Sequence, residues 1–244
     1  MGMSLAKLKS MLDESQRVVF FGGAGVSTES GIPDFRSEAG LFKTREGQSY
    51  PPERLLNHSF FIRYPDEFYR FYKSKMIYLD AKPNNAHLAL AKLEERGKLK
   101  AVITQNIDGL HQAAGSKNVL ELHGSIYRNY CMDCEERYPL SAVINSEVLV
   151  PICSSCNGII RPDVVLYEEP LDADIVDRAI DYIKNADMLI VGGSSLEVNP
   201  AASFINHYEG DRLVLINKSS TPYDDRANLV IKDSIGKVLE RVVS

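Results

Sequence analysis

The sequence has no tryptophan, four cysteines and no surplus of basic residues. Its 28 lysines and arginines are outnumbered by 33 aspartates and glutamates, which gives a formal net charge of -5. Non-specific nucleic-acid binding depends on basic residues that neutralise phosphates, so this balance argues against a nucleic-acid partner. No apolar run approaches the roughly 20 residues of a membrane span, and the N-terminus does not build a signal-peptide core. We therefore expect a cytoplasmic protein without a membrane partner.

The composition that is present is ordinary for a folded protein. Hydrophobic residues make up 44% of the 244 residues and charged residues make up 25%. A chain with these values buries a core, and its length fits one large domain or one domain with an insertion.

Six apolar runs predict β-strands. Their apolar residues are consecutive rather than alternating, which is typical of strands covered on both faces. Helical periods lie between them, over residues 87–96, 173–184 and 201–208. Alternating strands and helices predict an α/β fold with a Rossmann-like, doubly wound parallel sheet, in which ligands bind outside the carboxyl ends of the strands. The expected strands are 18–21, 101–104, 119–122, 164–167, 188–191 and 213–216.

The four cysteines form two C-x-x-C pairs, Cys131 with Cys134 and Cys153 with Cys156. Two such pairs at this separation predict one zinc ion bound by four thiolates, and this closed coordination shell indicates a structural site. Two disulfides are an alternative, which a reducing cytoplasm disfavours. A redox C-x-x-C is a further alternative, but it would not need duplication.

Two segments interrupt the strand and helix alternation. Residues 41–82 are rich in Tyr, Phe and Pro, and residues 130–161 contain all four cysteines. We expect them to form a smaller inserted domain, a helical module plus a zinc ribbon. Residues 1–40, 83–129 and 162–244 are then expected to form the Rossmann-like nucleotide-binding domain.

The segment over residues 20–36 reads F-F-G-G-A-G-V-S-T-E-S-G-I-P-D-F-R. A strand that breaks into glycines and small hydroxyl residues lets the backbone approach a phosphate and point N–H groups at it. The usual dinucleotide fingerprint has a third glycine where Thr28 stands, and Pro33 forbids a regular helix. The pattern favours a nucleotide site unlike that of a dehydrogenase, with a glycine-rich turn without a ligand as the alternative.

Polar side chains follow the next strands. T-Q-N-I-D at 104–108 offers amides and an acid that can hydrogen-bond ribose hydroxyls and a carboxamide. His123 at a strand end has a pKa suited to base chemistry, and Gly124 beside it is expected to clear room for a ligand. Four strand ends are expected to line one crevice: Gly22-Gly23, Gln105-Asn106, Gly192-Gly193 and Asn217.

Taken in order, these motifs closely resemble those of the sirtuins, the NAD-dependent protein lysine deacylases, of the bacterial type. The likeness runs from about residue 18 to 235. It includes G-A-G-V-S, G-I-P-D-F-R, T-Q-N-I-D, H-G, both C-x-x-C pairs, G-S-S-L at 193–196 and L-I-N at 215–217. The resemblance implies acyl transfer from lysine to the ADP-ribose of NAD with release of nicotinamide. It also implies acyl-lysine proteins or peptides as partners, and NAD and one structural zinc ion as cofactors.

The resemblance also implies roles for single residues. His123 is the general base for a ribose hydroxyl, and Asn106 is catalytic beside it. Phe35 lies at the glycosidic bond, and Arg36 orders the loop around the phosphates. The implied cofactor contacts are Gly23, Ala24, Thr28, Asp34, Phe35, Arg36, Gln105, Asn106, Ile107, Asp108, His123, Gly193, Ser194, Ser195, Asn217 and Ile235.

The peptide substrate is expected to add as an extended strand between residues 164–167 and the segment after Leu196. The implied substrate contacts are Val164, Val165, Leu166, Tyr167, Leu196 and Val198. Sirtuins that prefer acidic acyl groups have a Tyr and an Arg three residues apart, where this chain has Tyr69 and Tyr72. An acetyl or another uncharged acyl group is therefore favoured.

Three positions depart from the family pattern. Gly22 replaces a usual Thr, and Gly192 replaces a bulkier apolar residue. The family's F-G-E segment reads Tyr167-Glu168-Glu169, so a negative charge stands at the peptide groove in place of a glycine. Glu168 is expected to narrow the groove, to favour a basic peptide or to signal a different acceptor.

Three other functions stay open from the sequence. The same fold could transfer ADP-ribose to a protein nucleophile. A dehydrogenase fits less well, because the acidic residue expected after the second strand is missing. A binding module built on the zinc ribbon would not need His123.

Overall fold

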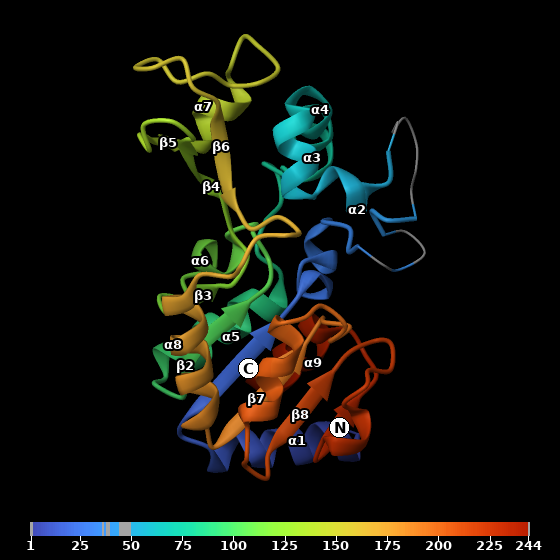
Figure 1. Cartoon of the computed structure of the whole chain (residues 1–244). Helices are drawn as coiled ribbons and strands as arrows, with labels where there is room; N and C mark the ends of the chain where they lie inside the picture. Colours follow the sequence, from blue (N-terminus) through green and yellow to red (C-terminus); the bar gives the residue numbers. More distant parts are fainter. Residues whose placement is uncertain (1, 36, 38–39, 44–49, 244) are drawn as a thin grey trace.

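The structure is a computed structural model that describes residues 2–35, 37, 40–43 and 50–243. A six-stranded parallel sheet forms one half of the molecule, and a three-stranded antiparallel sheet with short helices forms the other (Figure 1). The parallel sheet has the order β3-β2-β1-β7-β8-β9. Its strands are β1 (Val18–Gly22), β2 (Leu99–Thr104), β3 (Val119–Glu121), β7 (Met188–Gly192), β8 (Leu213–Ile216) and β9 (Leu229–Ile231).

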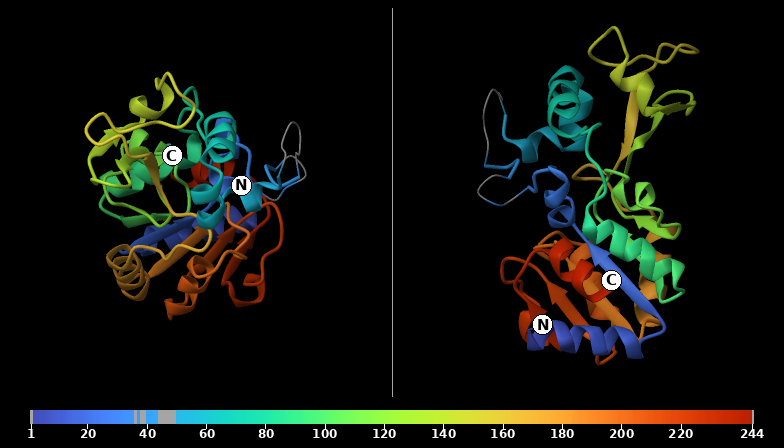
Figure 2. Two further views of the ribbon diagram at one scale, coloured as in Figure 1. Left: turned by 45° about the horizontal axis from the view of Figure 1, so that its top comes forward. Right: turned by 180° about the vertical axis from the view of Figure 1, so that it is seen from behind.

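Helices cover both faces of this sheet, as the consecutive apolar residues of its strands predict. On β1, Phe20 packs into one apolar cluster, and its neighbour Phe21 packs into the other. The first cluster includes α1 (Met3–Glu14), α5 (Asn85–Glu95) and α9 (Ile235–Val243), and the second includes α8 (Ala173–Lys184) (Figure 2). The doubly wound parallel fold is confirmed.

Local capping fixes where the helices begin. The Asn84 side chain accepts a hydrogen bond from the Ala86 N–H at the start of α5, and Asp172 accepts from the Ile175 N–H at the start of α8. Side-chain acceptors at these positions satisfy N–H groups that have no partner inside a helix. The expected helix over 201–208 is a 3-10 segment, η3 (Ala201–His207), in which the Ser203 hydroxyl donates to the Pro200 carbonyl and competes with helical bonding.

The predicted strand over 164–167 is wrong. The strand there is β6 (Ile160–Val164), which ends where the prediction begins and belongs to the antiparallel sheet of order β5-β4-β6. The Val165 N–H donates to the His123 carbonyl, and the Tyr167 N–H donates to the Leu56 carbonyl. These bonds hold residues 165–167 beside the second half of the molecule. An apolar run alone does not distinguish a strand from such a connecting segment.

The second half surrounds its own core. The antiparallel sheet contains β4 (Gly124–Cys131), β5 (Arg137–Pro139) and β6, and the associated helices are α2 (Pro52–Leu55), α3 (His58–Arg63), α4 (Pro65–Lys75) and α7 (Leu140–Ile144). Its core is mainly aromatic, with Phe61, Phe68 and Tyr69 all at most 1% exposed. The sheet begins at Gly124 and ends at Val164, so it is longer than the segment 130–161 that contains the cysteines.

The remaining regular segments are short: α6 (Leu110–Ala113), η1 (Ala24–Val26), η2 (Thr28–Ser30) and η4 (Asp224–Arg226). As Pro33 predicts, residues 31–35, which follow η2, form no helix. None of the described helices combines the length and the apolar character that a membrane crossing demands.

Candidate functional site

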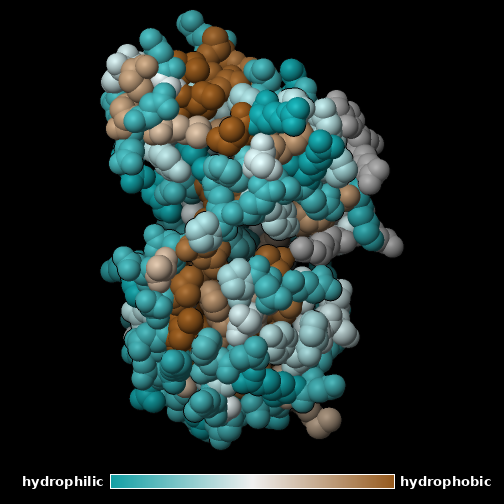
Figure 3. All heavy atoms as spheres, in the orientation of Figure 1, coloured by the Kyte–Doolittle hydropathy of each residue, from teal (hydrophilic) through white to brown (hydrophobic). Residues whose placement is uncertain are grey.

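A cavity of about 1010 Å³ lies between the two halves. The surface is hollowed where the two halves meet (Figure 3). The ends of β1, β2, β7 and β8, which are neighbours in the parallel sheet, supply one wall, so the four expected strand ends do meet at one crevice. The other half supplies residues 164–169 together with Leu56, Met76 and Tyr78. This is the position at which parallel α/β sheets bind ligands.

Glycines let two loops touch under the cavity. The Gly25 N–H donates to the Gly193 carbonyl at 2.8 Å, and a Cβ on Gly25 would lie 2.8 Å from that same oxygen. Gly193 has a φ of +60°, and a Cβ there would lie 2.3 Å from the Val26 nitrogen. Packing also requires a glycine at position 192, because a Cβ there would lie 2.0 Å from the Ile235 side chain of α9. The glycines therefore bring the β1 and β7 loops together at the switch point of the sheet.

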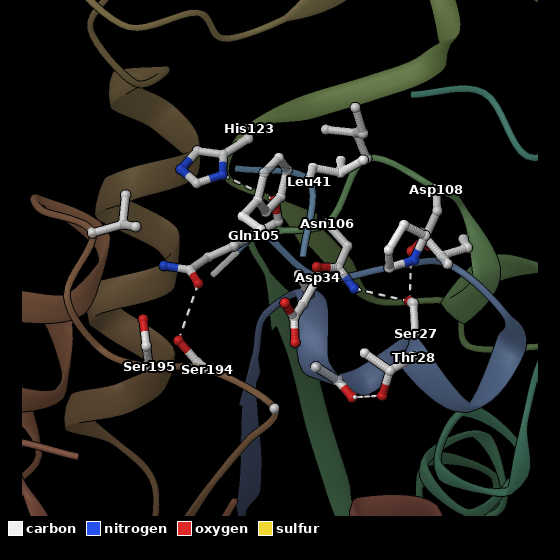
Figure 4. A pocket seen from close by; sticks show the side chains of 18 of the residues that line it. Ser27, Thr28, Asp34, Leu41, Gln105, Asn106, Asp108, His123, Ser194 and Ser195 are labelled. Atoms are coloured by element: carbon white, nitrogen blue, oxygen red, sulfur yellow. Dashed lines mark hydrogen bonds between the residues drawn. The ribbon is translucent and has the colours of Figure 1, made fainter. Parts of the chain in front are cut away.

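Beside the contact between these two loops, two side-chain amides have buried N–H groups without a hydrogen-bond acceptor. Gln105 Oε1 accepts from the Ser194 hydroxyl at 3.2 Å (Figure 4). Asn217 Oδ1 accepts from the Ser194 N–H at 3.0 Å. The Nε2 of Gln105 and the Nδ2 of Asn217 are buried without a hydrogen bond, although both residues line the cavity. Buried polar groups in native proteins are nearly always paired. These orphaned donors fit a ligand rich in oxygen, such as a nucleotide.

Ser27 joins two of the predicted site residues. Its hydroxyl donates to Asp108 Oδ2 at 2.6 Å and accepts from Asn106 Nδ2 at 3.0 Å (Figure 4). The other Asp108 oxygen accepts from the Leu110 N–H at 2.9 Å. The Asn106 and Asp108 side chains are thus held in fixed positions on the cavity wall. Sequence reasoning did not select Ser27, although the hydroxyl residue that ends G-A-G-V-S was the available signal.

His123 lines the cavity at the end of the segment after β3. Its Nδ1 lies 2.9 Å from the Gln105 carbonyl oxygen (Figure 4). Since a carbonyl only accepts, Nδ1 carries the proton and the neutral ring keeps Nε2 as an acceptor. Burial lowers the pKa of His123, although the Gln105 hydrogen bond acts in the opposite direction. The ring is therefore neutral near pH 7 and able to accept a proton.

Gly124 serves a different purpose from the one expected. It has a φ of +78°, and a Cβ there would lie 2.0 Å from the Asp163 carbonyl oxygen. The space beside His123 is thus filled by the backbone of β6 rather than by a ligand. The expectation that Gly124 clears room for a ligand is wrong, and its role is to let β4 and β6 approach.

Most of the sequence-predicted site residues lie on this cavity. Gly23 lies behind the wall, where its N–H donates to the Gly192 carbonyl, and Leu196 is buried in the core beside the parallel sheet. Arg36 lies outside the described residues. The predicted residues that line the cavity are Ala24, Thr28, Asp34, Phe35, Gln105, Asn106, Ile107, Asp108, His123, Val164, Val165, Leu166, Tyr167, Gly193, Ser194, Ser195, Val198, Asn217 and Ile235.

Tyr69 and Tyr72, the pair considered for acyl recognition, are core residues. Both are at most 1% exposed, and the Tyr69 hydroxyl donates to the Ile160 carbonyl. Lys75, Met76 and Tyr78, further along the chain, line the cavity instead.

The four cysteines meet at the end of the antiparallel sheet where β4 ends and β6 begins. Their sulfurs all lie within 4.8 Å of one another, with Cys131 and Cys156 at 3.3 Å and Cys134 and Cys153 at 3.6 Å. Four sulfurs bound tetrahedrally to zinc at about 2.3 Å would lie about 3.8 Å apart. All four cysteines are free of disulfides. The cluster therefore fits one structural zinc ion and excludes the disulfide alternative.

Comparisons with known proteins agree with this geometry. The family model described as "Sir2 family" matches residues 23–200. An NAD-dependent protein deacetylase from Clostridium acetobutylicum is 62% identical over 237 residues, which cover 97% of each chain. One from Cutibacterium acnes is 50% identical over 98% of each chain.

Solved structures are similar over the same length. A structure named "Sir2 bound to acetylated peptide" has a TM-score of 0.89 at 42% identity, and one named "Sir2-p53 peptide-NAD+" has a TM-score of 0.88 at 43% identity. Each comparison covers 98% of this chain and 97% of the other.

Proposed function

The chain belongs to the Sir2 family, and we propose on that basis that it is an NAD-dependent protein lysine deacetylase. It transfers the acyl group of a modified lysine to ADP-ribose and releases nicotinamide. The observation that carries the proposal is the neutral, carbonyl-bonded His123 on the same cavity as the Asn106–Ser27–Asp108 chain. Relatives 46–62% identical over nearly their whole length carry the same name, which supports it.

Bound NAD would supply the bond between nicotinamide and ribose that breaks in the reaction. The buried amide groups of Gln105 and Asn217 and the glycine contact at Gly25 and Gly193 would hold its oxygen-rich diphosphate and ribose region. Asn106 and Asp108 would orient the nicotinamide half. The proposed cofactor contacts are completed by Ala24, Thr28, Asp34, Phe35, Ile107, Ser194, Ser195 and Ile235, with Gly23 behind them in the wall.

His123 would act as the general base. With Nδ1 committed to the Gln105 carbonyl, Nε2 would accept the proton of a ribose hydroxyl, and the fixed ring would need no rearrangement. The acyl-lysine peptide would add its backbone to the segment after β6. It would be bordered by Val164, Val165, Leu166, Tyr167 and Val198, with Leu196 buried behind that border.

We propose that the two sheets mark two domains, one that binds the cofactor and a smaller one that the zinc ion stabilises. The boundaries would lie near residues 124 and 164, because β4 pairs with β5 on one side and with β6 on the other, and these described strands form a sheet separate from the parallel one. The zinc ion would take no part in the chemistry, because four thiolates leave no open position for a substrate.

The test is an assay with an acetyl-lysine peptide and NAD labelled in its adenylate part. We expect one equivalent each of nicotinamide and labelled acetyl-ADP-ribose for each peptide deacetylated. The His123→Ala variant is expected to lose about 10²- to 10⁴-fold in turnover, because general base catalysis contributes that much. Its NAD affinity, measured by calorimetry, should be nearly unchanged.

The His207→Ala variant is the matched control, because His207 lies on η3 and does not line the cavity. Full deacetylation by His123→Ala would refute the base assignment. Label that stays on protein instead of leaving as acetyl-ADP-ribose would identify ADP-ribosyl transfer as the main activity.

A further inference from the structure

Two adjacent acids at the cavity rim differ in what holds them. Glu169 Oε1 accepts from one Arg161 guanidinium nitrogen at 2.7 Å, and Oε2 accepts from another at 3.1 Å. Arg161 is buried, so this pair neutralises the charge of Glu169 inside the protein. Glu168 is exposed, and the donors that bond it among the described residues are all uncharged.

Those donors fix the Glu168 carboxylate at the start of α3. Oε2 accepts from the Ser59 N–H at 2.9 Å, and Oε1 accepts from the Ser59 hydroxyl at 3.0 Å and from Asn57 Nδ2 at 3.3 Å. The hydrogen bonds from Ser59 lower the pKa of Glu168, so the group is ionised at neutral pH. A carboxylate offers about four acceptor positions, so one remains for an outside donor.

The backbone places this charge beside the proposed peptide site. Glu168 has a φ of +78°, which is uncommon for a residue with a side chain. The neighbouring Tyr167 is bonded on both sides to the α3 entry, since its N–H donates to the Leu56 carbonyl and its carbonyl accepts from the His58 N–H. The turn therefore cannot swing the Glu168 carboxylate away without breaking several hydrogen bonds.

A second acid stands on the opposite border of the peptide site. Glu197 is exposed and lines the cavity in the segment that follows Leu196. Among the described charged residues that line the cavity, seven are acids, two are lysines and none is an arginine. A peptide that enters between residues 164–168 and 196–198 would pass between two exposed carboxylates.

We propose that Glu168 is a specificity-determining residue that selects protein substrates with Lys or Arg next to the acylated lysine. The inference rests on the proposed deacetylase function and names the substrate class of that site. Glu168 attracts the flanking cation electrostatically, and its Ser59 contacts keep it aimed at the groove instead of letting it fold back.

Three acetyl-lysine peptides of equal length test the proposal, with Arg, Ser or Glu at the two positions on each side of the acetyl-lysine. We expect kcat/KM for the Arg peptide to exceed that for the Ser peptide by about two- to five-fold, the effect of one exposed ion pair. The Glu peptide should be slower than the Ser peptide. The preference should act through KM and shrink between 0.05 and 0.5 M salt.

The Glu168→Gln variant removes the charge and keeps the size. We expect it to lose most of the Arg-over-Ser preference while its rate on the Ser peptide stays within about two-fold of the parent, because that peptide forms no ion pair. The Ser59→Ala variant keeps the charge and loses one hydrogen bond, so it should retain the preference. Glu240→Gln, an exposed change on α9 outside the cavity, is the matched control.

Each of the other possible outcomes would overturn one part of the proposal. Equal rates on the Arg and Ser peptides would refute the selection while leaving the deacetylase function intact. Loss of the preference in Glu197→Gln but not in Glu168→Gln would move the assignment to Glu197. Loss of the preference in Ser59→Ala but not in Glu168→Gln would show that the turn geometry, and not the charge, matters. No reaction with any of the peptides would refute the proposed function itself.

Discussion

The two sheets of this protein are stabilised in different ways. In the parallel sheet, β1, β7 and β8 are buried along their whole length between two layers of helices. The antiparallel sheet has three strands, and its core adds packed aromatic rings, the buried Arg161–Glu169 pair and the cysteine cluster. A small core supplies little hydrophobic stabilisation, so such folds rely on metals or other cross-links. The cofactor side is thus fixed by apolar burial, whereas the peptide side depends on a few specific contacts.

Zinc removal gives the largest effect that this difference predicts. Structural zinc sites contribute about 10–16 kcal/mol of binding free energy, which is also folding free energy. We expect chelation, or Cys156→Ser, to abolish amide exchange protection in β4, β5 and β6 while β1, β7 and β8 stay protected. Hydrogen-exchange mass spectrometry measures both sheets in one sample.

Ser154→Ala serves as the control for this experiment, because Ser154 lies between the two cysteines of its pair but is not a ligand. Equal loss of protection in both sheets would contradict the independence of the two cores. Unchanged protection in β4–β6 would show that the metal is not needed for that sheet.

Breaking the buried ion pair tests the same contrast on a smaller scale. Arg161→Met leaves the Glu169 carboxylate without its cation, and removal of one partner of a buried pair costs about 3–5 kcal/mol. The double variant Arg161→Met/Glu169→Gln should recover part of this loss, because no uncompensated charge remains. Urea denaturation measures both.

The matched control lies on the other half of the molecule. Arg212 pairs with Glu14 at 3.0 Å, but its side chain is 27% exposed and that of Glu14 is 57% exposed. Arg212→Met should therefore cost only about 0–1 kcal/mol. Similar losses in Arg161→Met and Arg212→Met would mean that burial does not set the value of these pairs.

The same contrast explains how much the sequence predicts. The strands of the parallel sheet could be located because their apolar residues are consecutive, and the 213–216 strand has the predicted bounds. The three-residue strand β9 was missed, since so short a run carries no usable period. The segment 164–167 was assigned to the wrong sheet. Val164 ends β6, Leu166 is buried in the aromatic core, and the N–H groups of Val165 and Tyr167 donate to the His123 and Leu56 carbonyls.

The candidate site shows the same limit. Glycines, amides and His123 could be identified from motifs because each lies directly after a strand. Ser27, Met76 and Tyr78 reach the cavity only through the way that distant segments pack, which no local pattern reports. Glu168 could be flagged as a departure, but its Ser59 and Asn57 partners, 109 and 111 residues away, could not be found without the fold.

The smallest predicted effect is a pH dependence of the parallel-sheet half. Burial lowers the pKa of His87 to about 4, with Asp108 acting in the opposite direction, and burial with nearby His87 lowers the pKa of His111 to about 3. Both imidazoles are neutral in the folded state but take up protons in the unfolded chain below about pH 6.5. Their contribution to the free energy of unfolding is therefore complete above pH 6.5. It is lost as the pH falls toward 4, by at most about 1.4 kcal/mol per pH unit for each histidine.

His111→Phe should reduce this slope by about half, because neither ring nitrogen of His111 has a hydrogen-bond partner and a ring of similar size can fill the space. Unfolding by urea at pH 7 and pH 5 measures the slope, with Leu110→Met as a neighbouring control that should shift stability equally at both pH values.

The antiparallel-sheet half loses stability at a lower pH. Burial raises the pKa of Glu169, but the hydrogen bonds from Arg161 outweigh this effect, so the pKa is lower than usual in the folded protein. The ionised Glu169 therefore stops stabilising the fold only as the pH falls below about 4.5. If the free energy of unfolding of His111→Phe falls between pH 6.5 and 5 as steeply as that of the parent, then neither His111 nor the Arg161–Glu169 pair causes the acid sensitivity.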